Sequence, residues 1–127
     1  MTIKYTIASR IPAGNRNGEL RYYARASQRQ LVGFREISRI ISDRSTASGP
    51  DVLLVLAALA EVIPELITDG KSVRLDGIGI FSSSFKAQEK RNPDEVTART
   101  IEKVRLKFLP DKEIKQQLKN CEFEKVK

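Results

Sequence analysis

The chain has no histidine and a single cysteine, Cys121. Protein zinc sites are built mainly from several Cys and His ligands, so the usual ones cannot be assembled here. Nucleophile pairs that depend on histidine, Ser–His and Cys–His, are excluded as well. A lone cysteine also excludes an internal disulfide and is typical of a reducing cytoplasm. Nothing points to carboxylate or lysine catalysis, so we expect no catalytic residue, no metal and no cofactor.

Long apolar runs are missing too. No run approaches the roughly 18 residues that a membrane span needs. The first five residues, MTIKY, contain neither the basic nor the apolar region of a secretory signal. We therefore expect a cytoplasmic protein with no membrane partner and no small-molecule substrate. With 127 residues, of which 40% are hydrophobic and 31% charged, the chain is expected to form one domain with a real core.

The net charge of +7 is spread unevenly along the chain. Residues 1–30 carry six Lys or Arg against one Glu, and residues 86–112 carry eight against five acidic residues. Residues 50–70 contain four acidic residues and no cation. This separation indicates a basic surface for a polyanion, built from both ends of the chain.

The first 30 residues predict a hairpin. Apolar and polar residues alternate over residues 3–7, and a second strand is predicted over residues 20–26. A loop rich in Gly, Asn and Pro joins them at residues 12–18. We expect residues 1–30 to extend the domain formed by residues 31–127. The alternative, to which we give equal weight, is an extra hairpin at the edge of the domain that enlarges it and has no role in binding.

Two helices are predicted next. Apolar residues recur at helical spacing over residues 34–43, and Gly49-Pro50 begin a second helix that Gly70 should end. The interior of that second helix, residues 52–60, is apolar on every side. One short helix and a small sheet cannot cover such a surface, whereas a second copy of the chain could. The sequence thus predicts a homodimer.

A sheet and a last helix follow. Strands are predicted over residues 72–75, 80–86 and 103–108, and the turn Gly77-Ile78-Gly79 joins the first two. A short amphipathic helix is expected over residues 110–119, and Phe123 and Val126 suggest a final extended segment. Elements grouped in this order indicate an α+β fold with an antiparallel sheet.

The stretch from Gly70 to Phe81, GKSVRLDGIGIF, resembles the signature of bacterial HU and integration-host-factor proteins, Gly-x-x-Val-x-Leu-x-Gly-Phe-Gly-x-Phe. Phe108, Pro110 and Lys112 match the family's Phe-Lys-Pro-Gly-Lys, and residues 91–93 match its Arg-Asn-Pro at the tip of an arm. The resemblance covers residues 33–120. It implies an HU-like fold with two N-terminal helices, a three-stranded antiparallel sheet with an arm and a short C-terminal helix, here with an added N-terminal hairpin.

The arm departs from the family pattern after Pro93. Family arms continue with Gln-Thr-Gly, which closes a β-ribbon, whereas this chain has DEVTART over residues 94–100. Asn92 is a good N-cap, Pro93 suits the first helical position, and two acidic residues follow. These residues favour a short helix over residues 93–99, with a ribbon tip as the alternative. In a helix, Pro93 is a start signal rather than a wedge between base steps.

The resemblance implies a histone-like, nucleoid-associated protein whose homodimer forms a saddle on the minor groove of double-stranded DNA. At matching positions it implies phosphate contacts by Gly77, Gly79 and Lys112. Strand alternation and position in the arm add Ser84, Lys86, Lys90, Arg91, Arg105 and Lys107. An HU-like module that binds proteins, with weak or no DNA binding, is the alternative.

Overall fold

A computed structural model of the chain describes residues 1–14, 18–27 and 29–126. These residues form two compact units. The first consists of Met1–Val32 together with Gln117–Lys127, and the second consists of Gly33–Gln116. The C-terminal residues therefore belong with the N-terminal ones, which local sequence patterns had not indicated.

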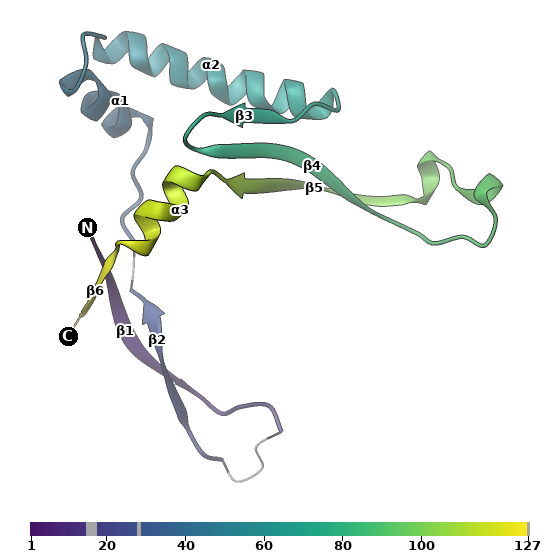
Figure 1. Ribbon diagram of the computed structural model, residues 1–127, viewed down its shortest axis with the longest axis horizontal. Coiled ribbons are helices and arrows are strands. Elements are labelled where there is room, and N and C mark those ends of the chain that lie inside the picture. The colour runs from purple at the N-terminus through teal and green to yellow at the C-terminus, as the bar shows by residue number, and fades with distance from the viewer. Residues whose placement is uncertain (15–17, 28, 127) are drawn as a thin grey trace. The chain divides into compact units, whose positions relative to one another are not determined.

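The first unit is built around a three-stranded sheet with the order β2-β1-β6 (Figure 1). Strands β1 (Thr2–Arg10) and β2 (Arg21–Ala26) pair antiparallel, as the predicted hairpin requires. Strand β6 (Glu122–Lys125) is the expected last extended segment, and it pairs with β1 in parallel. The N-terminal element is thus a mixed sheet rather than a hairpin alone.

The second unit begins with the two predicted helices. Helix α1 (Phe34–Asp43) has the predicted bounds, and α2 (Gly49–Thr68) continues through Pro64. Ser48 caps α2 because its hydroxyl accepts a hydrogen bond from the Asp51 amide at 3.2 Å. Pro50 stands in the first turn, where no donor is needed. Both helix predictions are confirmed.

The remaining strands of this unit form an antiparallel sheet with the order β3-β4-β5. Strand β3 (Val73–Leu75) is short, whereas β4 (Gly79–Ala87) and β5 (Ile101–Pro110) are paired over almost their whole length as a ribbon. Figure 1 shows α2 running along β3 and the base of this ribbon. Helix α3 (Lys112–Lys119) follows β5 and is shorter at its start than predicted. The fold is mixed α+β, and the described residues form three α-helices and two three-stranded sheets.

The ribbon ends in two 3₁₀ turns, Pro93–Glu95 and Ala98–Thr100. The predicted continuous helix over residues 93–99 is wrong, and so is the alternative of an uninterrupted ribbon tip. The helical start was correctly located, because Asn92 is extended and Pro93 opens the first turn. Val96 and Thr97 then adopt extended backbone angles, and their β-branched side chains favour that conformation over a helix.

The described residues bury few apolar side chains. Val52 is the buried hydrophobic residue among them, although the chain length predicts a larger core. Helix α2 meets α1 and the sheet along part of its surface, and Leu54 and Val55 remain 70% and 59% exposed. No helix within the described residues is long and apolar enough to cross a membrane.

Candidate nucleic-acid interface

One face of the β4–β5 ribbon is cationic. Residues directly opposite each other in an antiparallel pair share a face, and alternate residues along a strand return to it. The register pairs Ser82 with Lys107, Ser84 with Arg105, and Lys86 with Lys103. The strands therefore bring four of the predicted residues together on this face, which we call the ribbon face. Its members are Ser82, Ser84, Lys86, Lys103, Arg105 and Lys107.

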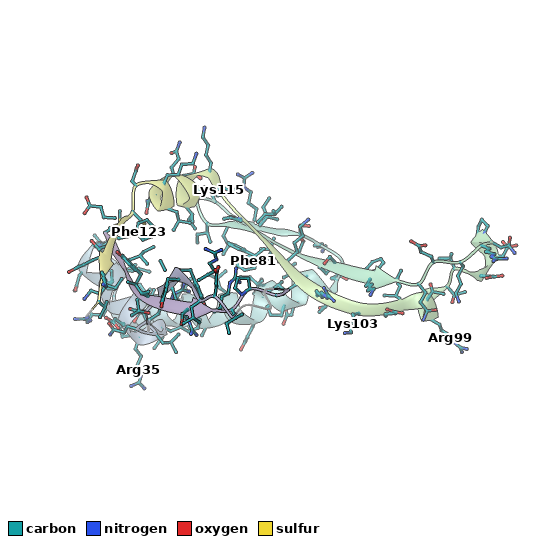
Figure 2. All side chains as sticks on the ribbon, turned by 90° about the horizontal axis from the view of Figure 1, so that it is seen from below. Arg35, Phe81, Arg99, Lys103, Lys115 and Phe123 are labelled. Atoms are coloured by element: carbon teal, nitrogen blue, oxygen red, sulfur yellow. The ribbon has the colours of Figure 1, made fainter. Side chains whose placement is uncertain are left out.

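The cations of the ribbon face lie close to one another, without acidic partners among the described residues. Lys86 and Lys103 are like charges directly opposite each other, an arrangement that destabilises a pair of strands. Within the part of the chain that the structure describes, none of the ion pairs includes a cation of this face. The side chains are exposed, and Figure 2 shows Lys103 on the ribbon and Arg99 near its tip. An anion bound at this face would reduce the repulsion between its cations.

The opposite face of the ribbon is apolar, and only its part near the base lies against α2. Its side chains come from Phe81, Phe85, Val104, Leu106 and Phe108, with Ser83 between them. The rings of Phe81 and Phe108 are 4.8 Å apart between centroids. Phe81 and Leu106 also line an apolar hollow of about 400 Å³ together with residues of α2. The contact of α2 with the base of this face leaves the cations on the other side of the ribbon, whereas Phe85 and Val104 further along are 61% and 71% exposed.

A buried carboxylate holds the glycine turn at the base of the ribbon. Asp111 is 8% exposed, and its Oδ2 accepts a hydrogen bond from the Gly77 amide at 2.9 Å. Its Oδ1 lies 3.5 Å from Nη2 of Arg74, and its amide donates to the Ile78 carbonyl at 2.9 Å. The Gly77 amide is thus already paired within the chain. A phosphate could contact this turn only through other groups.

The two glycines of the turn are required for different reasons. Gly77 has φ = 82°, a left-handed conformation that side chains disfavour, and a Cβ there would meet open space. Gly79 is buried, and a Cβ there would clash with the Leu109 carbonyl oxygen and lie 2.6 Å from the Phe108 ring. Packing within the chain is thus enough to require a glycine at position 79, and no bound ligand is needed to explain it.

The other predicted residues lie at the two ends of the ribbon. Lys112 begins α3, next to Asp111 and hence beside the glycine turn. Lys90 and Arg91 lie beyond the irregularity at Lys86/Ala87, in the connection that leads to the first 3₁₀ turn. They belong to the tip and not to the ribbon face. No cluster of His, Cys, Asp or Glu suited to a metal occurs in the residues described.

Two residues of this region were missed in the sequence. Lys103 lies in the predicted strand over residues 103–108 and has the same strand parity as Arg105 and Lys107, so the alternation of that strand could have found it. Asp111 departs from the family's glycine, and its contact with Gly77 spans 34 positions. A contact between such distant residues leaves no local pattern.

A family model described as an HU domain fused to a wHTH, Ig or glycine-rich motif matches residues 1–125. The chain belongs to this HU-HIG family. The expected resemblance to HU-like proteins is therefore confirmed. No curated protein sequence matches this HU-HIG chain.

Two solved structures share the fold of this HU-HIG chain. A candidate bacterial DNA-binding protein from Bacteroides vulgatus aligns with 98% of it at a TM-score of 0.68 and 13% identity. The chain spans about half of that protein, namely 48% of its length. The HU of an Anabaena HU–DNA cocrystal structure aligns with 70% of this chain and 99% of its own, at a TM-score of 0.54 and 22% identity. At these identities the likeness is one of fold alone.

Proposed function

We propose that the chain is a histone-like architectural protein that binds double-stranded DNA with little sequence preference. The ribbon face is the observation that carries this proposal, because its four cations take part in none of the ion pairs found among the described residues. Successive cations on β5 recur every second residue, at about 6.8 Å, which equals two base-pair rises of about 3.4 Å. Contacts of cations with phosphates carry no sequence information, so all duplexes bind similarly.

Further DNA contacts are proposed at both ends of the ribbon. Lys112, with Gly77 and Gly79 beside it, would approach the phosphates at the base. Lys90 and Arg91 would do so at the tip, where the minor groove admits cationic side chains. Because Pro93 opens a 3₁₀ turn, it serves the local backbone, and we do not assign it a wedge role.

We propose that the binding unit is a homodimer in which residues 31–127 form the HU-like domain and residues 1–30 extend it. Leu54 and Val55 on α2 and Phe85 and Val104 on the ribbon are all more than half exposed in one chain. Fully burying one such side chain contributes about 1.5–3 kcal/mol. A second copy of the chain that covered these apolar surfaces would leave the cationic ribbon face of each chain free to bind DNA. We expect such a protein to associate with the nucleoid.

The test is a salt titration of binding to a short duplex, with Arg105 and Lys107 changed together to Gln. Each lost phosphate contact should reduce the slope of log K against log salt by about 0.9. The variant should weaken binding to all sequences about equally and make the slope shallower by about 1.8 for each bound chain. The matched control changes Arg35 and Arg39 on α1 to Gln, which removes the same charge.

The wild-type chain should bind with micromolar or tighter affinity and a steep salt dependence. A shallow wild-type slope would contradict the electrostatic mechanism. Unaltered affinity in the Arg105/Lys107 variant would remove the ribbon face from the footprint, and equal weakening by the α1 control would show that only net charge matters.

A second candidate function, a module that binds proteins, is favoured by one observation. Strand β2 lies at the edge of its sheet, and all six of its residues are exposed. An exposed edge can accept a strand from another protein. Absence of DNA binding by the wild-type chain at low salt would favour this function over the first.

A further inference from the structure

The sheet of the first unit has a cationic face of its own. Its β1–β2 register pairs Arg10 with Arg21, Ala8 with Tyr23, and Thr6 with Arg25. Paired and alternating residues share a face, so these residues and Lys4 lie on the same side. We call this side the Arg face and define it by Lys4, Arg10, Arg21, Tyr23 and Arg25.

The Arg face holds like charges close together. Arg10 and Arg21 are directly opposite each other, a placement that costs stability unless an anion lies between them. Arg21 makes an ion pair with Glu19 at 3.6 Å, but both side chains are about two-thirds exposed, so this pair contributes little. The Arg10 guanidinium lies 5.6 Å from the centre of the Tyr23 ring, which favours a fixed guanidinium plane.

Apart from Glu19, which precedes β2, the acidic residues on the same side of the sheet lie in β6, at its other end. Glu122 and Glu124 of β6 pair with Thr2 and Lys4, at the beginning of β1. Arg10 is six residues further along β1, about 20 Å away at 3.4 Å per residue. The hairpin end of the Arg face is therefore cationic, and the β6 end is not.

The reverse side of this sheet is apolar. Ile3, Tyr5, Ala24, Ala26 and Phe123 line a hollow of about 390 Å³ there. The cations of β1 and β2 are thus sorted to one side, and arginine is the cation whose planar fork best matches a phosphate.

We propose that the Arg face is a second surface for the phosphate backbone of double-stranded DNA, separate from the ribbon face. This inference rests on the proposed function, since it takes the same ligand. Arg21 and Arg25 alternate with Tyr23 along β2, so their charges follow one line with an aromatic ring between them. The first unit then adds phosphate contacts to those of the ribbon and increases the salt dependence of binding.

The experiment compares three variants of the full chain in salt titrations with one duplex. Changing Arg10, Arg21 and Arg25 together to Gln removes the charges of the Arg face. Changing the same three residues to Lys keeps the charges. Changing Arg35, Arg39 and Arg44 to Gln removes three charges at α1 and the residue that follows it. Circular dichroism checks that each variant is folded.

The Arg-face Gln variant should bind more weakly, with a slope shallower by up to about 2.7 for each bound chain. The Lys variant and the α1 variant should keep the wild-type slope. If the Gln variant does not fold, Arg25→Gln alone should reduce the slope by about 0.9 per chain.

The outcomes separate this inference from the proposed function. A wild-type slope in the Arg-face Gln variant, while the Arg105/Lys107 variant loses affinity, overturns the second surface alone. Equal losses in the Arg-face and α1 Gln variants overturn it as well, because only net charge then matters. A wild-type chain that does not bind DNA overturns both.

Discussion

Asp111 connects three parts of the second unit through one side chain. Its carboxylate accepts from the Gly77 amide and faces Arg74, while its own carbonyl accepts from the Lys115 amide in the first turn of α3. The glycine turn, β3 and α3 are therefore fixed relative to each other by a residue that is 8% exposed. Gly77 is half-buried, and an amide shielded from water that loses such a partner keeps a cost of desolvation.

Replacing Asp111 by Ala should lower the free energy of unfolding by about 1–3 kcal/mol, because the Gly77 amide loses its acceptor. Asp111→Asn should cost less, since its side-chain oxygen can still accept. Chemical denaturation at one fixed protein concentration measures both. Asp76 is the control: it is 97% exposed and lies 3.6 Å from Arg74, so Asp76→Ala should change stability by under about 0.5 kcal/mol. A cost at Asp76 equal to that at Asp111 would contradict the role of the buried carboxylate.

The two glycines of the turn should differ in their response to alanine. Gly77→Ala should cost about 1–2 kcal/mol, because a left-handed backbone becomes strained although the Cβ has room. Gly79→Ala should cost more, because its Cβ meets the Leu109 carbonyl and the Phe108 ring, and β4 and β5 would have to move apart. Thermal unfolding of both variants gives the order. Equal stability of Gly79→Ala and the wild type would refute the packing explanation.

At the scale of elements, local sequence patterns were enough to predict those helices and strands whose bounds depend on their own residues. The bounds of α1 and the start of α2 follow from apolar periodicity and capping residues. The parallel pairing of β6 with β1 was not predictable, because it joins the two ends of the chain and leaves no turn signal. The same holds for Asp111, whereas Lys103 was within reach of strand alternation. The sequence thus indicated most of the ribbon face. It did not indicate the contacts of Asp111 with Gly77 and Arg74 at the base of the ribbon.

The tip of the ribbon depends on Thr100, which is buried. Its hydroxyl donates to the Thr97 carbonyl at 2.7 Å, and its carbonyl accepts from the Gln88 amide at 2.8 Å. Thr100→Val keeps the shape of the side chain and removes the hydroxyl, so it should weaken the tip by about 0.5–1.5 kcal/mol. Hydrogen exchange should then be faster at the Gln88 amide and unchanged in α2. Thr97→Val, at an exposed side chain, is the control, and faster exchange there to the same degree would contradict the hydroxyl's role.

For the molecule as a whole, the balance between exposed and buried apolar surface is the unusual feature. Residues 52–60 of α2 are apolar on every side, yet Leu54 and Val55 are 70% and 59% exposed in the single chain. Stable protein interfaces bury about 800 Å² on each partner, with a core of such side chains. If the homodimer forms through α2, the stability of each chain depends on the concentration of its partner.

A charge at Leu54 tests this dependence. In a lone chain Leu54→Glu would place the carboxylate in solvent and change little, whereas in a dimer interface the carboxylate would be buried without a partner. Sedimentation equilibrium at micromolar concentration should give about twice the 14.3 kDa chain mass for the wild type and a mass near one chain for the variant. Leu31, which is 95% exposed, supplies the control: Leu31→Glu should sediment as the wild type does. A wild-type mass near 14.3 kDa, or a dimer that survives Leu54→Glu, would contradict pairing through α2.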